Sequence, residues 1–322
     1  MKAYPFHLKY SFHPFLIFQW HWSKSSKADI FPFHYHSMKN ALRGVIAIIK
    51  KEYRDAIRNR WLIIISSIFF ILSIVISYFG ISGKEIGFHG IKDTVMALIS
   101  LISFLVPIIS IMLGYGSIIN EREKGSLNVL LSYPLTRAEV FIGKYFGLSM
   151  VLLTTIFVGF GGAGIVIAFG SSWSINWLSF ILFLIATFIV GMIFLGFSMV
   201  MSVVAKKRST AIGMAVFTWF FFTMIIGILL LGIYAATGGN IQEYMEGNLE
   251  SIPDWLWKAM FFSPLDTYQM FICLLYNVKT FFGYSVPAVP SYVNTGTTFL
   301  GIFLWAIASP ILAMILFRKK DL

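Results

Sequence analysis

The sequence predicts an all-α integral membrane protein, and two observations carry this prediction: the composition and a series of long apolar runs. Of the 322 residues, 58% are hydrophobic and 12% are charged, whereas soluble domains average about 45–50% apolar and about 25% charged residues. This excludes a soluble globular domain, and the hydrophobicity also excludes a disordered chain. Six runs reach the roughly 20 apolar residues that a helix needs to cross a bilayer. They are Trp61–Gly80, Thr94–Ile119, Tyr145–Phe169, Trp177–Val204, Ala211–Tyr234 and Thr298–Phe317.

Basic residues collect in alternate connections of this six-span pattern. The segment before the first span, the second and fourth connections and the C-terminal tail are basic, whereas the fifth connection is acidic. Lys and Arg stay on the cytoplasmic side of membrane proteins, so the net charge of +11 reports topology rather than nucleic-acid binding. The sequence therefore predicts a multi-pass protein of the cell membrane with both termini in the cytoplasm.

Residues 1–37 precede the first predicted helix and contain five of the six histidines. The segment has no helical or strand periodicity, and it lacks the apolar stretch and cleavage site of a signal peptide. A histidine-rich metal-loading tail is one interpretation, although the histidine spacings match no ligand pattern. The other is an extension that is poorly ordered or not native, with the working protein beginning at Met38.

Residues 38–60 have the apolar spacing of one helix face. The stripe consists of Leu42, Val45, Ile46, Ile49, Tyr53 and Ile57, and basic residues occupy the other side. A basic amphipathic helix that leads into a span is expected to lie at the membrane surface. A plain continuation of the first span into the cytosol is the alternative.

The connection between the second and third spans, residues 120–144, divides at Pro134. Thr136 with Glu139 three residues later forms a capping box, so the third helix is expected to begin before the membrane. Ahead of the proline, Gly125 allows a turn, and residues 126–132 can form two short helical turns. Such a stiff element between two spans suits docking into a partner, whereas a solvated linker is the alternative interpretation.

The long connection before the last span, residues 235–297, contains a short helix signal. Ser263 is an N-cap, with Pro264 at the first helical position and Asp266 at the third. The helix is expected to run to about Tyr276, which is too short to span and favours a re-entrant or interfacial segment. Glycines in the third and fourth spans, among them Gly159 and Gly196, predict close helix packing, with a hinge or substrate path as the alternative.

Several of these segments resemble type-2 ABC transporter permeases, the six-span membrane subunits of ABC exporters. The loop run is Glu121-Arg122-Glu123-x-Gly125-Ser126-Leu127-x-x-Leu130-Leu131-x-x-Pro134-x-Thr136-Arg137. The run Lys51-Glu52-x-Arg54-Asp55 resembles the family's connecting helix. The run Phe262-Ser263-Pro264-Leu265-Asp266-Thr267-Tyr268 resembles a segment of the branch related to the nitrous-oxide-reductase maturation permease. The resemblance extends from about residue 40 to residue 322.

The resemblance implies that residues 61–322 form a permease domain with a substrate path, coupled to separate ATPase subunits. The implied coupling residues are Glu121, Arg122, Glu123, Gly125, Ser126, Leu127, Pro134 and Arg137. The implied connecting-helix residues are Lys51, Glu52, Arg54 and Asp55, and the implied external lid contains Ser263, Pro264 and Asp266. The implied partners are an ABC ATPase, a second permease (the same chain or another) and membrane lipid, with no nucleic acid.

The chain lacks the motif that would let it hydrolyse ATP itself. Neither Gly83-Lys84 nor Gly143-Lys144 has the earlier glycine or the following Ser/Thr of a phosphate-binding loop. ATP and Mg²⁺ are therefore expected on the partner, and this chain is expected to have no catalytic residue, cofactor or metal. The six predicted spans contain no charged residue in their interiors, which disfavours an ion-coupled secondary transporter. That transporter is the alternative function, because unwound helix ends can bind ions without charge. The sequence does not indicate the substrate.

Overall fold

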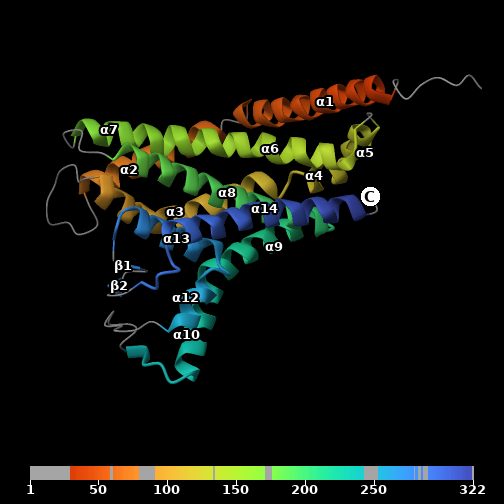
Figure 1. The fold of residues 1–322 in the computed structure, drawn as a ribbon. Helices are drawn as coiled ribbons and strands as arrows, with labels where there is room; N and C mark the ends of the chain where they lie inside the picture. Colours follow the sequence, from red (N-terminus) through yellow and green to blue (C-terminus); the bar gives the residue numbers. More distant parts are fainter. Residues whose placement is uncertain are drawn as a thin grey trace, which may run out of the picture. The chain divides into compact units, whose positions relative to one another are not determined.

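The computed structural model describes residues 30–58, 61–79, 91–132, 135–170, 176–242, 253–278, 280–281, 284–285 and 289–320. The chain forms two compact units, Met1–Asn40 and Ala41–Leu322. The second unit contains all the helices that correspond to the predicted spans (Figure 1).

Six helical runs correspond to the six predicted spans. They are α2 (Trp61–Phe79), α3 (Ile91–Gly114), α6–η1–α7 (Arg137–Ile156, Phe157–Gly161, Gly162–Gly170), α8 (Trp177–Val204), α9–η2–α10 (Arg208–Phe220, Phe221–Ile225, Ile226–Ala236) and α14 (Thr295–Lys319). Within the described residues, five helices are long and apolar enough to cross a membrane; a sixth candidate arises when α2 is taken together with Ala41–Arg58, from which it is bent by 67°. The predicted all-α membrane fold is confirmed.

Shorter elements connect these runs. They are α4 (Ile119–Glu123), α5 (Ser126–Leu131), α12 (Asp254–Met260), α13 (Pro264–Leu275), β1 (Thr280–Phe281) and β2 (Tyr284–Ser285). The two strands pair antiparallel over two residues each, a local addition that the all-α prediction did not include. The helix α13 is the short helix predicted before the last span, and it ends one residue earlier than expected.

The first helix, α1 (Ile30–Arg58), begins eight residues before the predicted start at Met38. The face that it packs on α6 is not the apolar stripe that was predicted to lie at the membrane surface, and that stripe stays a prediction. Ile48 is 5% exposed, whereas Leu42 and Ile46 of the predicted stripe are 61% and 40% exposed. The reason is the packing of the Ala41–Arg58 part on α6, where two glycines let the helix backbones approach. The sequence pattern alone did not show which apolar residues would face this neighbour.

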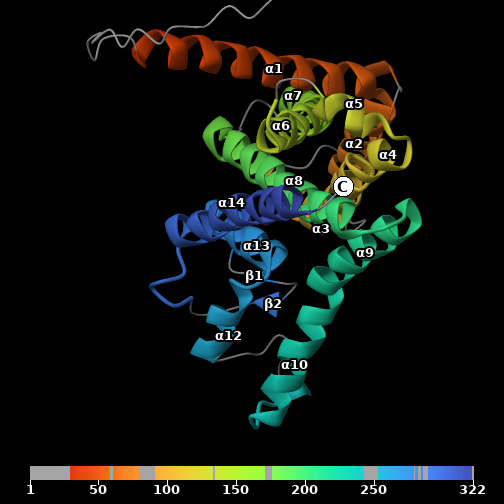
Figure 2. The ribbon, with the colours of Figure 1, turned by 90° about the vertical axis from the view of Figure 1, so that its right-hand side faces the viewer.

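Helix α8 is the centre of the bundle, and in both views it lies between α6, α3 and α14 (Figures 1 and 2). Its inward residues include Phe183, Val190 and Phe194, each with no exposed surface. Gly196 lets α8 lie against Ser309 and Pro310 of α14. These contacts agree with the packing interpretation of the span glycines, since small residues allow helix backbones to come close.

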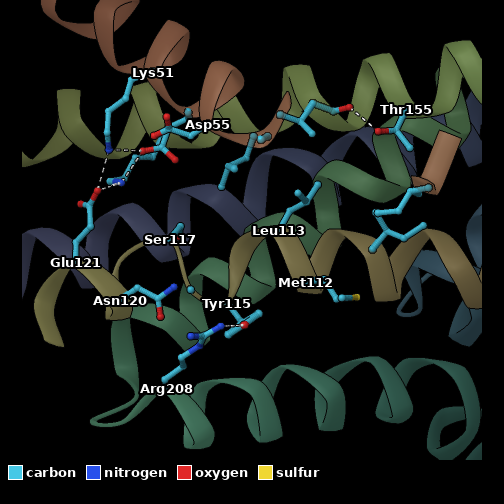
Figure 3. Close-up of a pocket in the computed structure, with 18 of the residues that line it drawn as sticks. Lys51, Asp55, Met112, Leu113, Tyr115, Ser117, Asn120, Glu121, Thr155 and Arg208 are labelled. Atoms are coloured by element: carbon cyan, nitrogen blue, oxygen red, sulfur yellow. Dashed lines mark hydrogen bonds and ion pairs between the residues drawn. The ribbon is translucent and has the colours of Figure 1, made fainter. Parts of the chain in front are cut away.

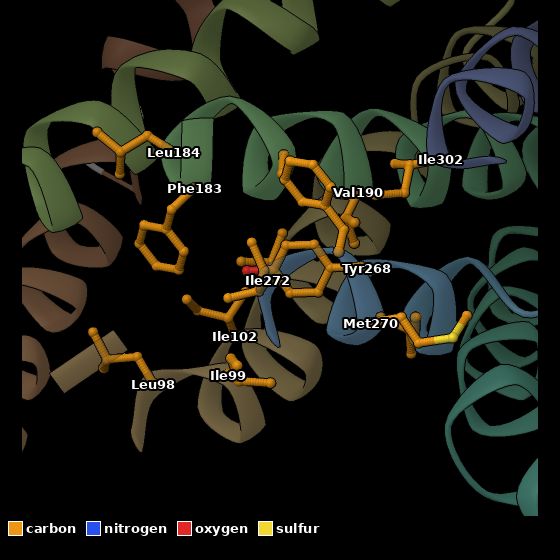
Figure 4. Packing of buried hydrophobic residues seen from close by; sticks show 14 of the residues in the cluster. Leu98, Ile99, Ile102, Phe183, Leu184, Val190, Tyr268, Met270, Ile272 and Ile302 are labelled. Atoms are coloured by element: carbon orange, nitrogen blue, oxygen red, sulfur yellow. The ribbon is translucent and has the colours of Figure 1, made fainter. Parts of the chain in front are cut away.

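Helix α13 is inserted into the core rather than lying on its surface (Figure 4). The hydroxyl of Tyr268 is 2.9 Å from the hydroxyl of Thr187 in α8, and both side chains are buried. Gln269 donates to the hydroxyl of Ser103 in α3 at 3.3 Å. These polar links fix a short helix that its own length would leave marginal.

The fifth span differs from the others in how little of it is covered. In its most apolar window only 6% of the residues are buried, whereas α6–η1–α7 and α8 reach 50% and 56%. Ala211, Ala215, Phe222 and Tyr234 are its buried positions. Most of this apolar helix is therefore available to lipid or to another protein chain.

Candidate functional site

The loop between α3 and α6 folds into two short helices separated by a left-handed turn. Gly125 has φ +71°, a conformation in which any side chain with a Cβ atom is strained. The backbone N–H groups of Ile118 and Ile119 donate to the hydroxyl of Ser202 in α8, at 3.1 and 3.0 Å. This hydrogen bonding satisfies donors at the start of α4, which would otherwise lack partners. The loop thus has a defined structure that is hydrogen-bonded to α8.

The predicted capping box begins α6. The Thr136 hydroxyl accepts from the Glu139 N–H at 3.2 Å, and the Glu139 carboxylate accepts from the Thr136 N–H at 2.7 Å. The helix then continues without interruption from Arg137 through η1 and α7 to Gly170. The capped start of α6 therefore connects the loop to the third span through one continuous helical run.

Four charged residues from three helices form a cluster, which we call the charge junction: Lys51 and Glu52 of α1, Glu121 of α4 and Lys144 of α6. The Lys144 ammonium lies 2.8 Å from Glu52 and 2.7 Å from Glu121, and its side chain is only 2% exposed. Lys51 approaches the same carboxylates at 3.4 and 3.2 Å but is 51% exposed. Because the Lys144 pairs are buried, salt screens them only weakly. The charge junction therefore ties the connecting helix, the loop and the third span together.

A second set of contacts attaches the loop to α8, α9 and the C-terminal segment. The Arg122 guanidinium donates to the carbonyl oxygens of Val203 and Ala205. Glu123 accepts from the backbone N–H of Arg208 at 2.8 Å. Arg137 donates to the carbonyl of Lys320 at 2.5 Å. Charged groups bonded to helix-end carbonyls and amides make stronger hydrogen bonds than neutral pairs do.

The remaining predicted loop and connecting-helix residues differ in their surroundings. Leu127 is 1% exposed in an apolar cluster with Phe141 and Met199. Ser126 is exposed, and its hydroxyl donates to the carbonyl of Glu121 at 3.3 Å. Arg54 and Asp55 are exposed on α1. Pro134 lies outside the described residues.

The predicted lid residues form the start of α13. Ser263 accepts from the Asp266 N–H at 3.2 Å, and Pro264 occupies the first turn. Burial raises the pKa of the Asp266 carboxyl to about 7. Nearby, hydrogen bonds from Lys258 and Tyr292 hold the pKa of Asp254 below its ordinary value. The predicted cap is confirmed, and its role as a lid stays a prediction.

No group of three or more potential metal ligands occurs among the described residues. His7, His13 and His21 of the proposed metal-loading tail lie outside them. Gly143-Lys144, one of the two Gly-Lys pairs in the sequence, lies inside α6 with its lysine engaged in the charge junction.

Sequence reasoning did not identify Lys144 as the centre of the junction, or the two glycines that position it. A Cβ atom on Gly143 would meet the Ile48 side chain at 2.8 Å, and one on Gly147 would meet Glu52 Cβ at 2.8 Å. The available signal was a Gly-x-x-x-Gly spacing, which allows two helices to approach closely, with a lysine inside it. That spacing brings Glu52 within reach of Lys144.

Comparisons with known proteins identify the family of the chain. Residues 46–322 match the family described as ABC-2 family transporter protein. The chain is 32% identical over 283 residues to the probable ABC transporter permease protein NosY of Stutzerimonas stutzeri, covering 85% of this chain and 97% of that protein. It is 32% identical over 293 residues to the protein of the same name from Pseudomonas aeruginosa, covering 86% and 99%. The chain therefore belongs to the ABC-2 family of transporter permeases, in the branch related to NosY.

Proposed function

We propose that this permease is the membrane subunit of an ATP-driven exporter, coupled through α4 and α5 to ATPase subunits on separate chains that bind ATP and Mg²⁺. The observation that carries the proposal is the charge junction. It links the loop that would contact the ATPase to the connecting helix and to the third span through a lysine with 2% exposure. Force applied to the loop would reach both helices at once.

The contacts of the loop separate residues that are bonded to this chain from residues that are free to contact the ATPase. The carboxylate of Glu121 and the guanidinium of Arg122 hold the loop to its own chain, with partners in α6 and α8–α9. Residues 123–126, by contrast, are exposed around the turn at Gly125. Under this proposal Lys124 and Ser126 contact the ATPase, while Glu121 and Arg122 transmit the movement.

We expect the complex to contain two permease chains and two ATPase subunits in the cell membrane, with both termini in the cytoplasm. The 6% burial of the fifth span supports a second permease, since it leaves an apolar helix uncovered within one chain. The one-sided distribution of Lys and Arg supports the orientation.

Substitution at Gly125 tests the coupling. Gly125→Val places a β-branched residue at φ +71°, where it costs on the order of 1–2 kcal/mol, although no atom lies within 4 Å of the new Cβ. Gly125→Asn is the matched control, because asparagine tolerates the left-handed conformation better than other residues with a side chain. We expect both variants to insert, and only Gly125→Val to lose transport-coupled ATP hydrolysis in proteoliposomes that contain the ATPase.

Two results would reject the proposal. Full coupling in Gly125→Val and in the double variant Lys124→Ala/Ser126→Ala would make the loop a linker. Transport by the purified permease alone, driven by an ion gradient, would establish the secondary transporter instead. The buried Lys144 is the observation that favours that second candidate, because ionisable groups buried in a membrane protein often serve ion pathways.

A further inference from the structure

The last four residues at the C-terminal end of α8, residues 202–205, each bond to another segment of the chain. We call these residues the α8 terminus. The Ser202 hydroxyl accepts the N–H groups of Ile118 and Ile119 at the start of α4. Carbonyl groups at the end of a helix have no partner within the helix. In the α8 terminus, three of them accept hydrogen bonds from cationic side chains of two other segments.

Two cations share these carbonyl groups. Arg122 of α4 donates to the carbonyl oxygens of Val203 and Ala205. Lys320, the residue that follows α14, donates from its ammonium to the carbonyl oxygens of Val203 and, at 3.0 Å, Val204. Positive charge is favourable at the C-terminal end of a helix, because the helix dipole is negative there. The Val203 carbonyl therefore binds one side chain from the loop and one from the segment after the last span.

Lys320 is also held by its backbone. Its carbonyl oxygen accepts from the guanidinium of Arg137, the first residue of α6, at 2.5 Å. Burial, followed by the nearby charges of Arg122 and Lys206, lowers the pKa of Lys320. The carbonyl groups of the α8 terminus thus hold the ammonium close to other cations. Lys320 therefore connects α8, α14 and both ends of the loop.

The loop is attached to the rest of the chain at two places that involve different helices. At the charge junction, Glu121 meets Lys51 of α1 and Lys144 of α6, and Figure 3 shows the pair of Lys51 and Glu121. At the α8 terminus, Arg122 shares its acceptors with Lys320. Because Glu121 and Arg122 are adjacent in α4, a displacement of α4 acts on both places.

We propose that Lys320 is a positioning residue that transmits movement of the loop to α8 and α14, the fourth and sixth spans. The charge junction transmits the same movement to α1 and the third span. Close packing of Gly196 in α8 against Ser309 and Pro310 of α14 lets these two spans move together once Lys320 joins their ends. This inference rests on the proposed coupling to an ATPase, and it adds a second route from the loop into the membrane.

Hydrogen exchange in the purified permease tests the contact itself. Lys320→Met removes the ammonium, and the N–H groups of Ile118 and Ile119 should then exchange about tenfold faster, the effect of losing one hydrogen bond to a charged group. Lys320→Arg keeps a cation that donates to carbonyl groups, so it should restore slow exchange. Lys319→Met is the matched control, because Lys319 is exposed and makes no hydrogen bond or ion pair with the other described residues. It should exchange as the wild type does.

Hydrogen exchange in the complex with the ATPase tests the route. Addition of AMP-PNP, an ATP analogue that is not hydrolysed, should change the exchange of the wild type at the start of α6 and at the ends of α8 and α14. In Lys320→Met we expect the response of α6 to remain and the responses of α8 and α14 to be lost. Lys320→Arg should recover them. The Tm and the number of bound ATPase subunits should equal those of the wild type, whereas loss of a purely structural residue would lower both.

Three outcomes would overturn the role of Lys320 and leave the proposed coupling in place. The first is equal exchange at Ile118 and Ile119 in Lys320→Met, Lys319→Met and the wild type. The second is a response of α8 and α14 to AMP-PNP that persists in Lys320→Met. The third is a large fall in Tm with loss of ATPase subunits, which would make Lys320 a structural cap. A wild-type complex in which AMP-PNP changes no part of the permease would instead reject the coupling, and the role of Lys320 with it.

Discussion

The Lys144 ammonium lies 2.7 Å from Oε1 of Glu121, and this contact joins the third span to the loop that follows the second. The same ammonium reaches Glu52 of α1 at 2.8 Å. One buried cation therefore pairs with two carboxylates from different helices, and the more exposed Lys51 supplies the second positive charge. Each carboxylate is mostly buried, with 13% exposure for the Glu52 side chain and 18% for that of Glu121. Burying these three charged groups costs desolvation free energy. The packing of α1, α4 and α6 on one another therefore depends on the Lys144 side chain.

Removal of this cation should destabilise the permease strongly. Lys144→Met leaves Glu52 and Glu121 close together without their buried counter-charge, and breaking such a pair costs about 3–5 kcal/mol. Lys51→Met is the matched control, because Lys51 meets the same carboxylates but is 51% exposed, where a pair contributes at most about 1 kcal/mol. Thermal unfolding in detergent should show a large fall in Tm for Lys144→Met and a small one for Lys51→Met. Equal falls would show that the junction does not depend on burial.

The features predictable from sequence are those encoded within a few neighbouring residues. A span is a run of about 20 apolar residues, and each of the six predicted runs coincides with a helical run. Among the described residues, five helices are long and apolar enough by themselves to cross a membrane. The caps at Thr136 and Ser263 depend on residues three positions apart, and both are formed. Helices and their starting points follow from local chemistry, and they could be read without knowing the packing.

The charge junction could not be predicted in this way. Lys144 and Glu52 are 92 residues apart, and each stands among other charged residues with several possible partners. Their pairing depends on the approach of α1 to α6 at Gly143 and Gly147, a tertiary contact. The burial of Ile48 has the same origin, since its side chain packs against Gly143 of α6.

A methyl group at Gly147 should separate α1 from α6. A Cβ atom there would lie 2.8 Å from Glu52 Cβ and 3.2 Å from the Ile49 backbone, so Gly147→Ala should cost about 1–3 kcal/mol through overpacking. Gly213→Ala in α9 is the control, because its Cβ meets no atom within 4 Å and alanine favours a helix by up to about 1 kcal/mol. Thermal unfolding of both variants should give Tm changes of opposite sign. A neutral Gly147→Ala would indicate that the two helices can separate freely.

The orientation in the membrane can be tested at two exposed lysines. In a Cys273→Ser background, Lys258→Cys in α12 should react with an impermeant maleimide in intact cells. Lys207→Cys before α9 should react only after the cells are opened, since the basic connections are expected in the cytoplasm. The reverse pattern would place both termini outside. Labelling at both positions in intact cells would contradict the predicted topology as a whole.

The stability of the α13 region should depend on pH through Asp266. Its pKa of about 7 in the folded chain exceeds the ordinary value of about 3.9, so between these values the folded state holds a proton that the unfolded state has lost. Linkage then makes the free energy of unfolding fall as pH rises from about 4 to about 7, with no further change above. Asp266→Asn cannot ionise, so it should become progressively more stable than the wild type across this window.

The matched control for this pH test is Asp254→Asn in α12. Lys258 and Tyr292 lower the pKa of Asp254, so its contribution to stability is constant above about pH 5 and is lost only in acid. We therefore expect the Tm difference between Asp266→Asn and the wild type to grow from pH 5 to pH 7 and to level off by pH 8. The corresponding difference for Asp254→Asn should stay flat over the same range. A flat Asp266 difference would mean that its carboxylate is solvated, and that α13 is not anchored in the core at its first turn.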